Sequence, residues 1–248
     1  RVLFRSDQSG AHSGLFIRSG LTYHLTPNDH FTIGGFGMFG NMNSNNTINY
    51  TSSVPGPYFE SRRLSDSDNS MNGANIELGY KHNFTKDSYL DFTASYNDWK
   101  MDNTSVFNQF SLDKKMSSYQ RQLSNMNYHT GEFQLDYQNK INENTKFEAG
   151  YKGSLGRGNS PVQTFSGLTE NSVTPDNKLY NSFIYNQDIH ALYTTYTGRI
   201  QKFGYQVGLR GEYSRIDTNS ETKSEDNKLN NNPFKKDYFS LFPSAFVS

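Results

Sequence analysis

The sequence predicts an all-β protein built as an antiparallel, up-and-down sheet, and three observations lead to that class. Apolar and polar residues alternate in many segments, which is the two-residue period of a half-covered strand. Of the 248 residues only 33% are hydrophobic but 15% are aromatic, whereas a disordered chain would be poor in aromatic residues. Short and long connections also alternate along the chain, as they do when neighbouring strands run antiparallel.

About nine strands can be placed from this alternation. In the third, Ala74, Ile76 and Leu78 occupy one face, and Asn75 and Glu77 occupy the other. The second segment is rich in glycine, and the seventh carries polar residues on both faces. The nine segments are 15–25, 31–42, 74–84, 90–97, 132–137, 146–152, 183–196, 203–214 and 238–248.

The connections indicate a transmembrane barrel rather than a soluble sheet. The short ones are 26–30, 85–88, 139–145 and 197–202, and the long ones are 43–70, 102–124, 156–181 and 217–237. Alternating segments of about 10 residues, with short turns at one end and long loops at the other, are typical of outer-membrane barrels. Aromatic residues also bracket each short turn, as in an aromatic girdle: Tyr23 and Phe31, Phe84 and Tyr89, Tyr137 and Phe147, and Tyr196 and Phe203.

Charged residues occur in the middle of the polar faces, as a wet lumen would allow. The candidates for lumen-facing residues are Glu77, Lys81, Asp91, Glu132, Asp136, Glu148, Lys152, Arg210 and Glu212. Their mixed signs favour pairing across the wall, or with a plug, over a selectivity ring of one sign. The alternative is a soluble antiparallel sheet, which is also half apolar. Soluble sandwiches, however, seldom carry loops of about 20 residues at one end only.

The long loops supply candidates for ligand contact. Tyr50, Tyr58, Phe59, Phe107 and Phe110 stand in segments that are otherwise rich in Asn, Ser and Pro. Aromatic and amide side chains together suit glycans or other polar ligands. The simpler interpretation is that these residues pack on one another at the surface.

Composition and motifs exclude several other functions. The formal net charge is zero, which argues against nucleic-acid binding, and cysteine is absent, which removes thiolate chemistry. A Gly-x-Gly-x-x-Gly match at 35–40 precedes an Asn-rich segment rather than a helix, and the partial calcium-loop pattern from Asp66 to Glu77 has Met71 where glycine is required. We therefore expect no cofactor, no metal site and no enzymatic activity.

Three segments resemble the barrel region of TonB-dependent outer-membrane receptors of the Bacteroidota type. They are Asp-Ile-His-Ala-Leu-Tyr-Thr-Thr-Tyr from Asp188, Tyr-Gln-Val-Gly-Leu-Arg-Gly-Glu-Tyr-Ser from Tyr205, and Tyr-Phe-Ser-Leu-Phe-Pro-Ser-Ala-Phe-Val-Ser from Tyr238. The resemblance implies a barrel of about 22 strands closed by a plug domain. It also implies nutrient uptake, of a siderophore, glycan or similar, across the Gram-negative outer membrane. TonB would act through the plug, and in some relatives a surface lipoprotein covers the loops.

No plug domain is visible in residues 1–248, so we expect the chain to be part of a larger barrel embedded in outer-membrane lipid. Two alternatives stay open. One is a secreted, soluble β-sheet module for glycan binding or adhesion, with its aromatic residues in a core. The other is a small outer-membrane barrel enzyme with Ser, His and Asp drawn from different strands.

Overall fold

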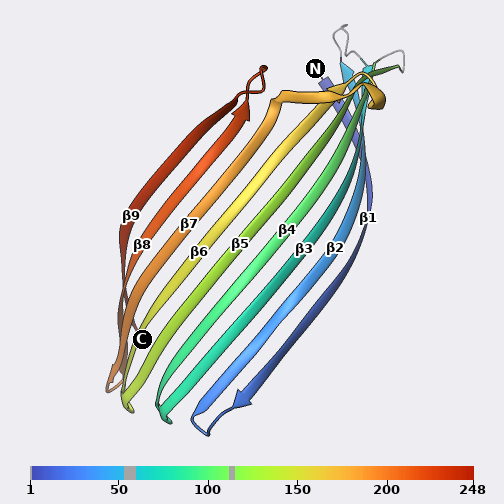
Figure 1. Ribbon diagram of the computed structural model, residues 1–248. Helices are drawn as coiled ribbons and strands as arrows, with labels where there is room; N and C mark the ends of the chain where they lie inside the picture. Colours follow the sequence, from blue (N-terminus) through green and yellow to red (C-terminus); the bar gives the residue numbers. More distant parts are fainter. Residues whose placement is uncertain (1, 53–59, 112–114) are drawn as a thin grey trace.

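The computed structural model describes residues 2–52, 60–111 and 115–248, and it forms one curved sheet whose nine antiparallel strands follow chain order (Figure 1). The strands are β1 (Val2–His24), β2 (Asp29–Ser52), β3 (Glu60–Thr85), β4 (Ser88–Phe110), β5 (Met116–Asn142), β6 (Thr145–Gly167), β7 (Thr174–Ile200), β8 (Phe203–Lys223) and β9 (Leu229–Val247). One short 3-10 helix, η1 (Glu170–Ser172), lies between β6 and β7. Within the described residues, no helix is long and apolar enough to cross a membrane. The prediction of an all-β, up-and-down antiparallel architecture is confirmed.

The strands are much longer than the alternation predicted, and the expected long loops are mostly strand. β2 and β3 stay paired from Asp29 opposite His82 to Thr51 opposite Glu60, so most of the predicted loop 43–70 is a hairpin arm. The predicted loops 102–124, 156–181 and 217–237 are likewise largely strand. Backbone pairing continues beyond the alternating part because Asn, Ser and Thr side chains can pair across strands when both faces are wet.

The sheet is a single layer without a hydrophobic core. Among the described residues only two hydrophobic side chains, Tyr119 and Ala191, are buried. The strands hold together through their backbone ladders and cross-strand side-chain pairs. Many large apolar side chains therefore remain exposed on one face, and a patch of this size marks a surface that a membrane or another protein covers.

The sheet is also open. Figure 1 shows β1 at one edge and β9 at the other, and within the described residues each pairs with one neighbour only. β9 pairs with β8 from Tyr205 opposite Val247 to Lys223 opposite Leu229. It is therefore a full member of the sheet, and the nine described strands do not close into a barrel by themselves.

Candidate functional site: a barrel wall with one charged and one apolar face

The strand register decides which side chains share a face, because residues directly opposite one another in neighbouring strands point the same way. Lys81 lies opposite Asp91, and Asp91 opposite Asp136. The same row continues through Gly150 and Tyr193 to Arg210. Followed in this manner, all nine residues that were predicted to share the polar side lie on one face, which we call the charged face. They are Glu77, Lys81, Asp91, Glu132, Asp136, Glu148, Lys152, Arg210 and Glu212.

Most of these charges are paired within the sheet. The ion pairs are Lys81–Asp91 at 3.9 Å, Lys152–Glu132 at 3.3 Å, Lys146–Glu148 at 2.9 Å and Arg210–Glu212 at 2.9 Å. Glu77 forms no ion pair within the part of the chain that the structure describes. Acidic and basic side chains therefore stand next to one another on this face, although six of the nine residues are acidic. This arrangement agrees with the predicted pairing rather than with a selectivity ring.

Asp136 is the centre of a hydrogen-bond network on the charged face. The hydroxyl of Tyr193 donates to its carboxylate, and the amide Nε2 of Gln134 donates to Oδ2 at 2.5 Å. The guanidinium of Arg210 lies 5.7 Å from the centroid of the Tyr193 ring. Gly150, which stands between Asp136 and Tyr193, leaves the space that the tyrosine ring occupies. A Cβ there would come within 2.5 Å of that ring.

The opposite face, which we call the apolar face, carries large hydrophobic side chains that no other part of the described chain covers. Phe92, Leu135 and Leu209 are 38%, 40% and 47% exposed. No second protein layer covers them within the described residues, as it would in a soluble sandwich. The predicted alternation is therefore confirmed, and the apolar side chains are left for an external apolar medium.

The apolar face has a limited height. In β8 it runs from Phe203 to Tyr213, close to the 9–11 residues that a tilted strand needs to cross the hydrocarbon core. Beyond that level, toward the predicted long loops, ion pairs replace apolar side chains on the same face. They are Asp98–His129 at 3.3 Å, Arg157–Asp188 at 2.5 Å and Asp217–Lys235 at 2.8 Å. The strands thus continue past the apolar band into water.

The aromatic residues at the short turns lie on the apolar face, with one exception. Phe84, Tyr137 and Phe147 lie on that face, as an interfacial girdle requires. Tyr89 is on the charged face instead, so its assignment to the girdle was wrong. Its ring lies 3.8 Å from the ammonium of Lys81, and its position follows from strand parity, which proximity to a turn does not fix.

At the first short turn a small polar cluster surrounds Asp29. His82 Nδ1 and the Tyr80 hydroxyl donate to Asp29 Oδ1 at 2.6 and 2.7 Å, and the Thr26 hydroxyl donates to Oδ2. These hydrogen bonds, that from His82 first, hold the pKa of the Asp29 carboxyl well below its ordinary value of 3.8. The cluster links the first residue of β2, which follows the turn at 25–28, to the end of β3.

Replacing Asp29 by asparagine is expected to lower the melting temperature at neutral pH, because the charged acceptor is lost. The pKa of this carboxyl is lower in the folded protein than in the unfolded chain, so its charge stabilises the fold at any pH above the pKa of the unfolded chain. That contribution is lost as the pH falls through the pKa of the folded protein. The gap between wild type and Asp29→Asn should therefore shrink below about pH 4. Thermal unfolding in detergent over a pH series measures it. Asp87→Asn, at the next turn along, is the matched control, and a gap that persists unchanged in acid would contradict the assignment.

The predicted loop residues do not lie in loops. Tyr50 belongs to β2, and Phe107 and Phe110 belong to β4. Phe107 is held under the guanidinium of Arg63, 4.5 Å from its ring centroid, so part of its surface is occupied within the sheet. Tyr58 and Phe59 lie outside the described residues. The structure brings none of the described three into a loop cluster.

An apolar patch on the charged face was not predicted from the sequence. Phe16 and Phe36 lie with ring centroids 5.6 Å apart, and Phe36 and Trp99 with centroids 6.0 Å apart. Met71 and Met101 lie one row further on. The alternation pattern treats each strand alone, so only the register between strands would have brought these residues together.

The Gly-x-Gly-x-x-Gly match and the acidic pattern are both strand. Residues 35–40 continue β2 without a break, so no helix N-terminus is present for a phosphate. Asp66, Asp68 and Glu77 belong to β3, where the even and odd positions point to opposite faces. Their carboxylates therefore do not converge.

The two segments that carry most of the family resemblance are neighbours in space. In β8, the run from Gly208 to Glu212 lies beside the run from Phe239 to Ser244 in β9. Leu209 lies opposite Pro243 on the apolar face, and Arg210 opposite Phe242 on the charged face. The two segments therefore form one continuous part of the sheet, with side chains on both faces.

A one-layer sheet with an apolar band on one face, a charged opposite face and strands that overrun the band defines the wall of an outer-membrane β-barrel. The family comparison agrees: the chain belongs to the outer membrane protein beta-barrel family, whose model matches residues 81–248. It is accordingly a protein of the outer membrane. No curated protein matches the sequence.

One solved receptor structure shows the same fold, and a second is similar. The ferric yersiniabactin uptake receptor FyuA from Yersinia pestis aligns with a TM-score of 0.52 and 10% identity over 97% of this chain and 43% of the receptor. The siderophore receptor PiuA from Acinetobacter baumannii aligns with a TM-score of 0.48 and 11% identity over 98% of this chain and 44% of the receptor. The chain thus spans less than half the length of each receptor.

Proposed function

We propose that this chain is part of the barrel of a TonB-dependent outer-membrane transporter that takes up a nutrient such as a siderophore or a glycan, and that it is not an enzyme. The observation that carries the proposal is the two-faced, open sheet. An unpaired sheet edge has no water to bond within lipid, so β1 and β9 require further strands as neighbours. A larger barrel, of about 22 strands in the receptor type that the sequence resembles, meets that requirement.

The charged face then lines the lumen. Its paired charges suit a wall that contacts water and a plug domain, because paired charges retain hydrogen bonds in a partly wet interior. In this proposal the plug belongs to a part of the protein outside residues 1–248, and TonB acts through that plug. The overrunning strands form the extracellular rim, on which a surface lipoprotein would rest.

The barrel is tested by location and orientation. An epitope inserted after Asp226, in the turn between β8 and β9, is expected to be labelled on intact cells. An epitope inserted after Glu143, in the short turn between β5 and β6, should be labelled only after the outer membrane is opened. The protein should migrate differently on a gel with and without heating, as folded barrels do. Recovery in the soluble fraction, or labelling of both epitopes on intact cells, contradicts the proposal.

Transport is tested with defined probes. Cells are offered ⁵⁵Fe-loaded siderophores and radiolabelled oligosaccharides, and accumulation is compared with and without the protein and with and without TonB. At least one probe should accumulate only when both are present. Accumulation that is independent of TonB would contradict this mechanism, while surface labelling would still establish the barrel.

A further inference from the structure

Five of the six methionines lie on the charged face, in a single patch over β2 to β5. Met71 lies opposite Met101, and Met101 opposite Met126. Met38 and Met42 stand on β2 at positions that flank Gly40, which is itself opposite Met71. Most of the thioether sulfur of the chain therefore lies at one place on the charged face, beside the aromatic patch of Phe16, Phe36 and Trp99.

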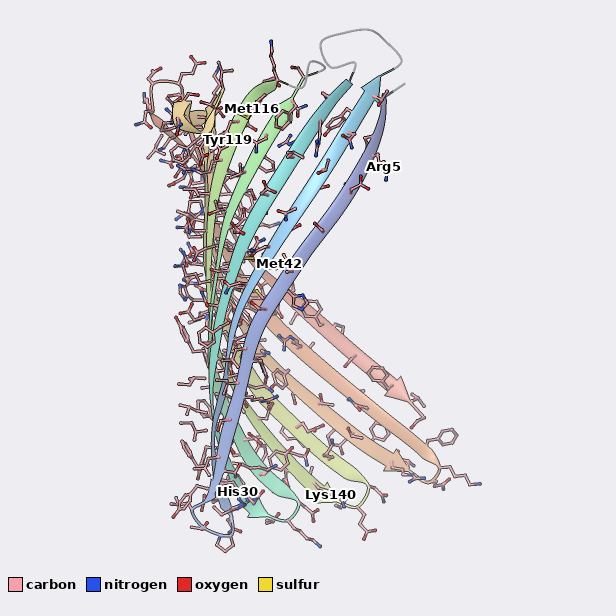
Figure 2. The ribbon with its side chains drawn as sticks, turned by 90° about the vertical axis from the view of Figure 1, so that its right-hand side faces the viewer. Arg5, His30, Met42, Met116, Tyr119 and Lys140 are labelled. Carbon is pink, nitrogen blue, oxygen red and sulfur yellow. The ribbon has the colours of Figure 1, made fainter. Side chains whose placement is uncertain are left out.

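Four of these methionines surround one hollow. It has a volume of about 430 Å³, and its lining includes Met38, Met42, Met71 and Met101 together with His12. Its open centre lies over Gly40, where an added Cβ would find no side chain within 4 Å. His12 lies directly opposite Met42, so its imidazole is on the same face. Figure 2 places Met42 midway along the sheet, between Arg5 near one end and His30 near the other.

The geometry allows the sulfurs to meet. Neighbouring strands are about 4.8 Å apart, and positions i and i+2 of a strand are about 6.7 Å apart. A methionine side chain has three rotatable bonds and a polarisable sulfur, so Met71 can meet Met42 on one side or Met38 on the other, whereas Met38 and Met42, four residues apart on β2, cannot reach one point together. Met101 reaches the same hollow from the next strand. No strained backbone is required.

The donor set selects the ligand. Thioether sulfur and imidazole nitrogen are soft or borderline donors, and they favour Cu(I) and similar ions over hard cations such as Ca²⁺ or Mg²⁺. Among the described residues that line the hollow there is no Asp or Glu, so the carboxylate oxygens that a hard cation prefers are missing. A neutral site also suits an ion with a single positive charge, which needs little charge compensation.

We propose that this methionine hollow is a binding site for a soft monovalent cation, Cu(I) or Ag(I), on the inner wall of the barrel. The inference rests on the proposed function, since it takes the charged face to be the lumen. It would add a soft metal ion to the substrates of the transporter. Neither siderophore nor glycan chemistry calls for four thioethers around one hollow of the wall.

The experiment compares two variants of the whole protein, folded in detergent. Met71→Leu/Met101→Leu keeps the apolar surface and removes two sulfurs. Met116→Leu removes one sulfur at the far end of β5, which Figure 2 shows well away from Met42. Retention of Ag(I) after desalting is measured by mass spectrometry over a titration series, and the folded state of each variant is checked by its shift on an unheated gel.

Wild type and Met116→Leu are expected to retain Ag(I) with the same affinity, and the double variant should bind at least about tenfold more weakly. X-ray absorption at the silver edge should show sulfur neighbours that the double variant lacks. Equal Ag(I) binding by wild type and the double variant overturns the inference, because an apolar patch would not distinguish methionine from leucine. Absence of Ag(I) binding overturns it as well. If TonB-dependent uptake of another probe survives in that case, the proposed function still stands; if the protein is not in the outer membrane, the proposed function itself has failed.

Discussion

Replacing Phe92 by arginine is expected to impair membrane insertion more than any other single change considered for the apolar face. Phe92 lies in the middle of the apolar band on β4 and is 38% exposed in the isolated sheet, so in the membrane its ring meets lipid. An arginine near the bilayer midplane of a barrel wall costs about 2–4 kcal/mol. Urea unfolding in lipid vesicles measures the loss, and the fraction that fails to fold appears on an unheated gel.

The matched control is Thr93→Arg, one residue further along the same strand. Thr93 lies on the charged face, opposite Gly79 and Gln134, so its arginine would enter the wet side of the wall. We expect a change within about 0.5 kcal/mol there. An equal loss of unfolding free energy in the two variants would show that the apolar face is not turned to lipid. That result would favour the alternative of a soluble β-sheet module.

The opposite orientation of Phe92 and Thr93 was predictable from the sequence, because the alternation of apolar and polar residues can be recognised within a single strand. The face of Leu135 and the face of Glu132 follow from the alternation alone. The height of the band was also predictable, since apolar alternation ends where charges such as Asp98 and Arg157 begin.

The extent of the strands was not predictable in this way. Beyond the band both faces meet water, so the residues of 43–52 and 60–70 need no apolar alternation in order to pair. Polar composition then predicts a loop where a hairpin arm exists. The contacts between strands were not predictable either. The neighbours of Tyr89, Met71 and Met101 depend on the strand register, and the hairpin turns set that register.

The charged face offers the second large effect, through Gly150→Val. Gly150 lies between Asp136 and Tyr193 in the row of paired charges, and the Tyr193 ring occupies the space above it. A Cβ at this position would lie 2.5 Å from the Tyr193 ring and 2.6 Å from Asp136 Oδ1. The two valine methyl groups must therefore push the ring aside and break its hydrogen bond to Asp136, at a cost of about 1–3 kcal/mol.

Gly131→Val is the matched control for that variant. Gly131 lies on the apolar face of β5, opposite Tyr96 and Leu155, and a Cβ there would meet nothing within 4 Å. Valine favours strands and would add apolar surface toward lipid, so the free energy of unfolding should stay the same or rise slightly. Urea unfolding of both variants in lipid vesicles gives the comparison. If Gly150→Val is as stable as Gly131→Val, the Tyr193 ring does not need the space above Gly150, and the Asp136 network does not hold this part of the wall together.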